Sequence, residues 1–155
     1  MSWISFSSVE LQAVTLSLWV AMVSVILSLP AAIAVAHLLA RKQFWGHSFL
    51  NALVHLPLVL PPVVTGYVLL VAFGRKGIFG PVLEAFGLQL AFTSAGAALA
   101  AAVMAFPLIV RSIRLAIEAV DPELEEAAST LGASPLYIFV YVTLPLILPG
   151  ILAGS

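Results

Sequence analysis

Cysteine is absent from this chain of 155 residues. Its absence excludes a disulfide framework, a thiolate metal site and a cysteine nucleophile. Charged residues are scarce as well, at 8% of the sequence, and the formal net charge is −1. Because the chain has no excess of positive charge, it offers no electrostatic footprint for nucleic acid, which we do not expect as a partner.

Recognisable catalytic patterns are also missing. The sequence contains no phosphate-binding G-x-x-x-x-G-K-S/T pattern, and it shows neither a nucleophile paired with a base nor a cluster of metal ligands. We therefore predict that the chain is not an enzyme, holds no metal and binds no cofactor itself.

What the chain has in abundance is apolar side chains. Hydrophobic residues make up 63% of the sequence, and the mean hydropathy is +1.18. A soluble domain of this composition would leave large apolar areas in water. We predict an all-α, polytopic membrane protein in contact with lipid. The N-terminus has no basic residue ahead of the first apolar run, so a cleaved signal peptide is not indicated.

Long apolar runs predict the spans. The first covers 9–40, and Pro30 should kink it. Another covers 90–118, where many small residues favour close packing between membrane helices. The last apolar run, 145–155, is too short to span, so we interpret it as the start of a fourth helix in a longer protein. Its glycines at 150 and 154 form a helix-pairing pattern.

A second span is predicted over 49–73, and several prolines interrupt it. Backbone groups freed by proline at hydrocarbon depth are tolerated only where protein or water satisfies them, and transporters use such breaks along translocation paths. Breaks and polar groups in this span, together with Ser94 of the run 90–118, predict a set of path residues: His55, Pro61, Pro62, Thr65, Gly66 and Ser94. The alternative is a kink that only shapes packing, with His55 as a satisfied packing histidine.

The segment 121–144 is a polar, acidic island in this apolar sequence. Asp121 is a good N-cap, Pro122 suits the first helical position, and the glutamates that follow favour the positive end of the helix dipole. Gly132 can adopt the left-handed conformation that ends a helix after Leu131. A second short helix is predicted from Pro135 to Val142, with Ser134 as its cap, and Leu144-Pro145 should end it.

The first helix of this island presents one apolar face, made of Leu124, Ala127, Ala128 and Leu131. Such a short helix is not stable alone, because it buries too little area. It therefore needs a partner groove. The alternative, equally open from the residues alone, is a helical hairpin packed on its own membrane domain.

The order Glu126-Ala127-Ala128, Gly132, Val142-Thr143-Leu144-Pro145 resembles the EAA loop of ABC importer permeases, with Val142 where isoleucine is usual. The resemblance implies that 121–144 is a cytoplasmic coupling loop, which docks on an ATPase subunit. Its implied coupling residues are Glu123, Leu124, Glu126, Ala127, Ala128, Leu131, Gly132, Leu144 and Pro145.

The chain from about residue 10 to its end is similar to the molybdate branch of these permeases, most clearly over His55 to Leu70, Phe73 to Gly80 and Ala91 to Ser134. This resemblance implies a type I importer permease fold, and a homodimer with two ATPase subunits that carry the ATP. It further implies an external binding protein that delivers molybdate or tungstate. A sulfate or thiosulfate permease and a non-transporting membrane scaffold are the alternatives.

Charge sets the expected orientation in a prokaryotic cell membrane. The predicted external loop, 74–89, holds Arg75 and Lys76 between two glycines, a basic point that could contact the binding protein or be a solvated helix end. The opposite side would hold four basic residues, which favours it as the cytoplasmic side and leaves the N-terminus outside. These four are Arg41, Lys42, Arg111 and Arg114.

Overall fold

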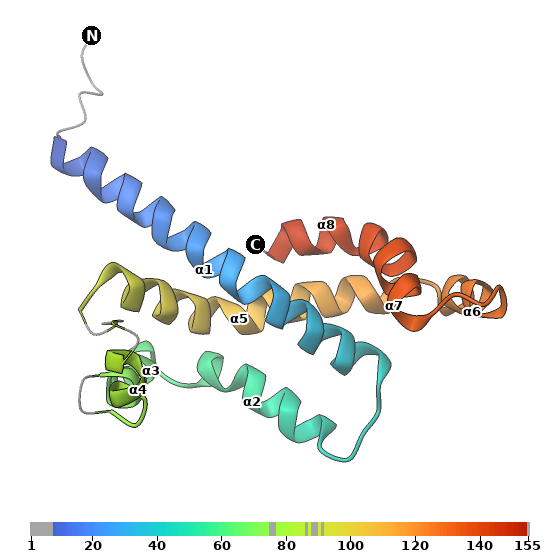
Figure 1. The fold of residues 1–155 in the computed structure, drawn as a ribbon, viewed down its shortest axis with the longest axis horizontal. Helices are drawn as coiled ribbons and strands as arrows, with labels where there is room; N and C mark the ends of the chain where they lie inside the picture. Colours follow the sequence, from blue (N-terminus) through green and yellow to red (C-terminus); the bar gives the residue numbers. More distant parts are fainter. Residues whose placement is uncertain (1–7, 75–76, 86, 88–89, 91, 155) are drawn as a thin grey trace, which may run out of the picture. The chain divides into compact units, whose positions relative to one another are not determined.

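The computed structural model describes residues 8–74, 77–85, 87, 90 and 92–154, and all regular structure in these residues is helical (Figure 1). The all-α prediction is therefore confirmed. The elements in chain order are α1 (Ser8–Arg41), α2 (His47–Val59), α3 (Pro62–Phe73), α4 (Gly80–Ala85), α5 (Ser94–Glu118), α6 (Pro122–Thr130), α7 (Pro135–Ile138), a π-helical turn (Phe139–Thr143) and α8 (Leu144–Gly154).

Three helical stretches of the described chain are long and apolar enough to cross a membrane: Ser8–Arg41, Ser94–Glu118 and Pro135–Gly154. A fourth span arises if α2 and α3 are taken together as one broken span. The break lies at Leu60 and Pro61, inside the segment where the prolines predicted an interruption. The predicted external loop contains one short helix, α4, that the sequence did not indicate.

The chain forms two compact units, and their boundaries fall close to prolines within the helices. The first unit comprises the described residues of 1–28 and 57–104, and the second comprises 29–56 and 105–155. The divisions lie near Pro30 in α1, at Pro57 in α2 and near Pro107 in α5. Proline interrupts the hydrogen-bond ladder of a helix, so these are the positions at which each helix is least stiff.

In the first unit, α1 and α5 are joined by a serine. The hydroxyl of Ser24 lies 2.7 Å from the carbonyl oxygen of Ala98 and 2.6 Å from that of Val20, so it can donate to either. Such a bond between helices suits an apolar environment, in which an unpaired polar group is costly. Thr65 of α3 is also buried, and its hydroxyl has no hydrogen-bond partner among the described residues.

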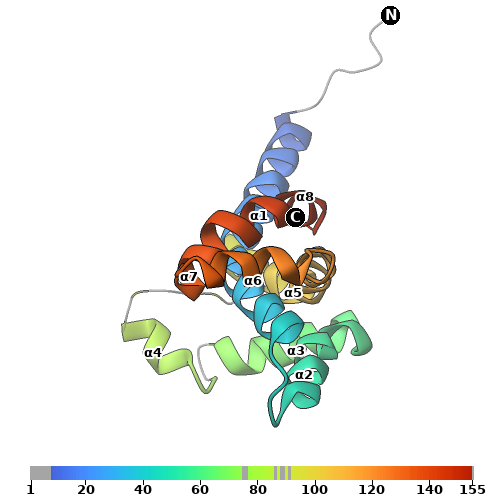
Figure 2. The ribbon, with the colours of Figure 1, turned by 90° about the vertical axis from the view of Figure 1, so that its right-hand side faces the viewer.

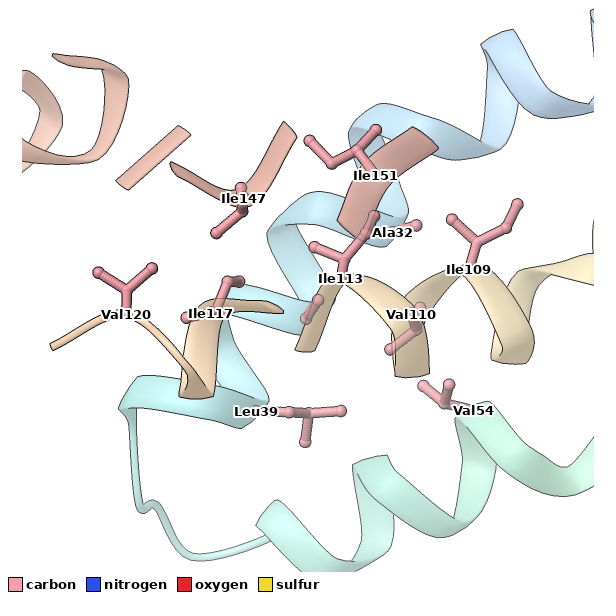
Figure 3. Packing of buried hydrophobic residues seen from close by; sticks show 11 residues of the cluster. Ala32, Leu39, Val54, Ile109, Val110, Ile113, Ile117, Val120, Ile147 and Ile151 are labelled. Carbon is pink, nitrogen blue, oxygen red and sulfur yellow. The ribbon is translucent and has the colours of Figure 1, made fainter. Parts of the chain in front are cut away.

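The second unit has a continuous apolar core between α1, α2, α5 and α8 (Figure 3). The side of α5 that turns inward carries residues at helical spacing, which is why one helix can contact three neighbours. The buried members are Ala32, Ala36, Leu39, Val54, Ile109, Val110, Ile113, Ile117, Val120, Ile147 and Ile151.

α8 runs antiparallel along the second half of α5 (Figures 1 and 2), and its glycines lie at the contact. A Cβ atom added at Gly150 would overlap that of Ala116, and one added at Gly154 would lie 2.8 Å from the Cβ of Ser112. The Ser112 hydroxyl donates to the Gly150 carbonyl oxygen at 2.8 Å. The predicted glycine pairing pattern therefore packs two helices of this chain closely together.

The expected helix end at Leu144-Pro145 is wrong. The helix that begins at Pro135 continues through this point to Gly154, and it is 20 residues long. A π-helical turn lies directly before Leu144-Pro145, and the Leu144 N–H donates to the Phe139 carbonyl, five residues back. This wider turn makes room for the proline ring, which would otherwise clash with the preceding turn. The last apolar stretch is therefore long enough to span.

Candidate functional site

α6 and the turn that follows it form the most polar part of the second unit, and their local signals behave as the sequence predicted. The Asp121 carboxylate accepts a hydrogen bond from the Glu123 N–H at 3.0 Å, and Pro122 occupies the first turn. Gly132 has a φ of +85°, the left-handed conformation that ends the helix after Leu131. Ser134 then caps the next helix by accepting from the Tyr137 N–H.

The apolar face of α6 points away from the rest of the described second unit. Leu124 is 49% exposed and Leu131 is 88% exposed, although both are leucines. Ala127 is exposed and Ala128 is half-buried. Within the described second unit this face is therefore largely unpacked.

Most of the other predicted coupling residues are exposed as well. Glu123, Glu126, Gly132 and Pro145 are all exposed, whereas Leu144 is half-buried and packs against the core. α6 thus presents leucine, small residues and carboxylates together on its open side.

The other side of α6 is attached to α1 through Glu125. One oxygen of its carboxylate lies 3.1 Å from Nη2 of Arg41, at the end of α1, and accepts from the hydroxyl of Thr143 at 2.7 Å. Arg41 also donates from Nη2 to the carbonyl oxygen of Val120 at 3.2 Å. We call Glu125, Arg41 and Thr143 the Glu125 clamp.

The Glu125 clamp is shielded from solvent. The side chains of Arg41 and Glu125 are 20% and 21% exposed, and Thr143 is 1% exposed. A charged pair in such a partly desolvated place interacts more strongly than one on an open surface. Since Thr143 belongs to the π-helical turn, the clamp joins α1, α6 and the last helix at one point.

A cavity of about 210 Å³ lies beside the clamp, lined in part by His37, Ser129 and Ile138. The His37 ring contacts the Phe139 ring edge-on, with 4.9 Å between their centres. Nδ1 of His37 and Nε of Arg41 are buried without partners among the described residues. The clamp therefore has space and unused hydrogen-bonding groups on one side.

The predicted path residues lie in different surroundings. Pro61, Pro62, Gly66 and Ser94 are exposed in the first unit, and Thr65 is buried there. His55 belongs to the second unit, where its Nδ1 bonds the Asn51 carbonyl oxygen of its own helix at 2.8 Å. That bond is consistent with the alternative of a packing histidine, which forms its hydrogen bond within its own helix.

One of these residues, Gly66, lines a cavity of about 120 Å³ in the first unit. The other lining residues are apolar or glycine, so no side chain there can donate a hydrogen bond to an oxyanion. The role of these positions in a path stays a prediction. Arg75 and Lys76, the predicted contact with a binding protein, lie outside the described residues.

Sequence reasoning missed the Glu125 clamp. The sequence predicts for Glu125 only a charge at the positive end of a helix, and for Arg41 only a basic residue on the cytoplasmic side. Their positions are 84 residues apart, so no local spacing connects them. By contrast, Arg114 and Glu118 are four residues apart on one helix, a spacing at which an ion pair can be predicted from sequence, and they pair with 2.7 Å between Nε and Oε1.

Helices of membrane-spanning length, together with a capped polar helix whose apolar face is exposed, define a helical integral membrane protein. Comparison with known proteins gives the family. Residues 28–155 match the family described as the inner membrane component of binding-protein-dependent transport systems, and the chain belongs to that family.

Several relatives are called molybdenum transport system permease protein ModB. The one from Haemophilus influenzae is 58% identical over 146 residues, and the one from Escherichia coli K12 is 56% identical over 147 residues. A relative from a Helicosporidium species, named a probable sulfate transport system permease protein, is 36% identical over 146 residues. Each match covers 94% of this chain, but only 64%, 64% and 54% of the three relatives.

Proposed function

We propose that this chain is part of the permease subunit of an ATP-driven importer for molybdate, and for tungstate as a chemically similar dianion. In this proposal the permease forms the translocation path, and separate cytoplasmic ATPase subunits bind and hydrolyse ATP. The chain itself is then not an enzyme and needs no cofactor. An external binding protein delivers the anion, and two copies of the permease and two ATPase subunits form the complex.

The observation that carries the coupling role is the asymmetry of α6. Leu124 and Leu131 are exposed on one side, while Glu125 is tied to α1 on the other. A short helix fixed to its own protein from behind, with leucines in front, suits a groove on a partner. Exposed carboxylates such as Glu126 can pair with basic groups at the rim of that groove.

The mechanism proposed is alternating access. ATP binding draws two ATPase subunits together and displaces the α6 helices docked on them. The spans interrupted by proline follow that displacement, so that the path opens outward to accept the anion from the binding protein. Hydrolysis then reverses the displacement, and the anion leaves on the cytoplasmic side. In this arrangement α6 is cytoplasmic and the N-terminus is external.

The choice of anion rests on the relatives. Permeases named for molybdenum are 56–58% identical to this chain, whereas the relative named for sulfate is 36% identical. The sulfate alternative is therefore less supported. The scaffold alternative leaves the proline-broken segment at Leu60 and Pro61 without a role in transport.

The test uses the full-length protein with its ATPase and binding protein in proteoliposomes. ATP hydrolysis is measured with the binding protein loaded with molybdate, tungstate or sulfate. We expect stimulation by molybdate and tungstate and none by sulfate. Stimulation by sulfate alone would identify sulfate as the substrate instead. Failure of the permease to bind any ATPase would favour the scaffold alternative.

A second arm of the experiment tests docking. Glu126→Ala and Gly132→Val should reduce co-purification of the ATPase and uptake of the anion, while insertion into the membrane continues. Valine at 132 is strained because φ there is +85°. Wild-type assembly and uptake in both variants would exclude the coupling role of α6.

A further inference from the structure

α6 must do more than dock if its displacement is to reach the spans. A docked helix on a loose tether would move with the ATPase and leave the membrane part where it was. Two described connections leave α6 along the chain, through Val120 to α5 and through Ala133 to α7. Both pass through short segments outside the helices, which are the softest parts of the backbone.

The Glu125 clamp bypasses both of these segments. It connects the middle of α6 directly to the end of α1, a helix of 34 residues, and to the turn that leads into α8. Its bonds are charge-assisted or short, at 3.1 Å and 2.7 Å. Charge-assisted bonds are about twice as strong as neutral ones, and a partly desolvated position limits exchange with water.

Arg41 has a second attachment that makes the clamp stiffer. The same Nη2 atom donates to Glu125 and to the carbonyl oxygen of Val120, just before α6. The guanidinium is therefore held to both the start and the middle of the α6 segment. Two points of attachment restrict rotation of α6 about its contact with α1, which one point alone would allow.

We propose that Glu125 is a positioning residue that makes α6 and the end of α1 move as one body, so that a displacement of α6 is transmitted to α1 through Arg41 and to the last span through Thr143. This proposal rests on the proposed function, because it names the route by which a docked ATPase would act on the spans. Glu125 contacts neither the anion nor ATP in this account.

The clamp includes one residue of the π-helical turn. Thr143 is the last residue of that turn, and its hydroxyl donates to Glu125. A π-helical turn shifts the side chains that follow it relative to a regular α-helix, and such turns recur at functional sites. Thr143 and Ile147 are four residues apart, so they lie on one face of the helix after the turn, where Thr143 meets the clamp and Ile147 the core.

The experiment compares Glu125→Gln with Glu118→Gln in the full-length protein, reconstituted with its ATPase and binding protein. Both substitutions remove the charge of a glutamate paired with an arginine, but Glu118 pairs within α5. We measure the amount of bound ATPase, the stimulation of hydrolysis by the loaded binding protein, and the number of anions imported per ATP.

For Glu125→Gln we expect normal binding of the ATPase but a loss of stimulation and of anions per ATP on the order of tenfold, as for other coupling free energies. Glu118→Gln should match the wild type. A Glu125→Gln complex with wild-type stimulation and import ratio would overturn the proposal. A merely structural role would lower the yield of complex and leave the import ratio of assembled complexes unchanged.

Spin labels on Lys42 and Thr130 give a direct measurement of the motion, and this stretch of chain has no cysteine to replace. Their distance should be the same without nucleotide and with ATP trapped, and its distribution should broaden in Glu125→Gln. A distance that changes with nucleotide in the wild type would overturn the one-body motion. Failure of the proposed function would show differently, as a wild-type complex that imports none of the anions.

If Glu125→Gln does not assemble, Thr143→Val carries the test. It removes one donor from the clamp and keeps the charges of Arg41 and Glu125. Because one neutral donor is lost, we expect a smaller fall in the import ratio, about threefold. An unchanged ratio in Thr143→Val would then reject the proposal.

Discussion

Two glutamate–arginine pairs in this protein have similar chemistry and different consequences. Arg114 and Glu118 lie one turn apart on α5, 2.7 Å from each other, with side chains 29% and 42% exposed. Arg41 and Glu125 lie 3.1 Å apart, come from positions 84 residues apart in the chain, and are 20% and 21% exposed. The first pair lies within one helix, whereas the second connects two helices.

The difference shows that the length of an ion pair says little about its importance. The shorter pair is the more exposed one, and exposed pairs contribute little because water screens them and long side chains lose freedom. The longer pair shares its acceptor with the buried Thr143 hydroxyl. The importance of an ion pair depends on its burial and on how many structural elements it connects.

The largest expected effect is on the Glu125 clamp. A double-mutant cycle with Arg41→Met and Glu125→Gln should give an interaction free energy of about 2 kcal/mol, because each single change leaves a partly buried charge without its partner. Unfolding of the purified full-length protein by SDS in mixed micelles measures it. The interaction should largely persist in 1 M salt, since ions screen partly buried pairs less.

An interaction free energy near zero in this cycle would remove the distinction between the two pairs. So would a strong dependence on salt, because that behaviour is typical of exposed charges. Arg41→Lys serves as a control, since it keeps the positive charge and loses the planar group that reaches both Glu125 and the Val120 carbonyl.

A smaller effect is expected from the neutral member of the clamp. Thr143→Val should lower the free energy of unfolding by about 1 kcal/mol, the usual cost of one lost hydrogen bond. Thr65→Val is its matched control, because Thr65 is also buried but its hydroxyl has no partner among the described residues. The second substitution should be neutral or stabilising, and the same SDS unfolding measures both.

Equal destabilisation by the two substitutions would contradict this account, because it would mean that burial alone, not the bond to Glu125, sets the cost. Thr65→Val also bears on the predicted path. If the Thr65 hydroxyl contacts the anion during transport, import should fall even though the protein is no less stable.

The same contrast explains which features could be predicted from the sequence. The fold class, the caps at Asp121 and Ser134, the left-handed Gly132 and the Arg114–Glu118 pair all depend on residues close together in the chain. Local spacing is sufficient for such features. The Glu125 clamp depends on how α1 meets α6, and a single sequence carries no signal for that meeting.

The prolines show that a local sequence rule can hold and still give different structures. Pro61 and Pro62 coincide with a helix break, whereas Pro145 lies inside a continuous helix. The rule that proline disrupts a helix holds at both places, but at Pro145 the disruption is absorbed by a π-helical turn. That turn places Thr143 against Glu125, a tertiary contact that the sequence does not reveal.

The smallest expected effect is on the exposed pair. A double-mutant cycle with Arg114→Met and Glu118→Gln should give an interaction of about 0.3 kcal/mol, because arginine precedes glutamate in the less favourable order along the helix. In 1 M salt it should vanish. Arg114→Met alone should cost more than Glu118→Gln, since Nη1 of Arg114 also lies 3.3 Å from the side-chain oxygen of Asn51 in α2. If the interaction free energy of this pair equalled that of Arg41 and Glu125, the strength of an ion pair here would not depend on whether it connects two helices.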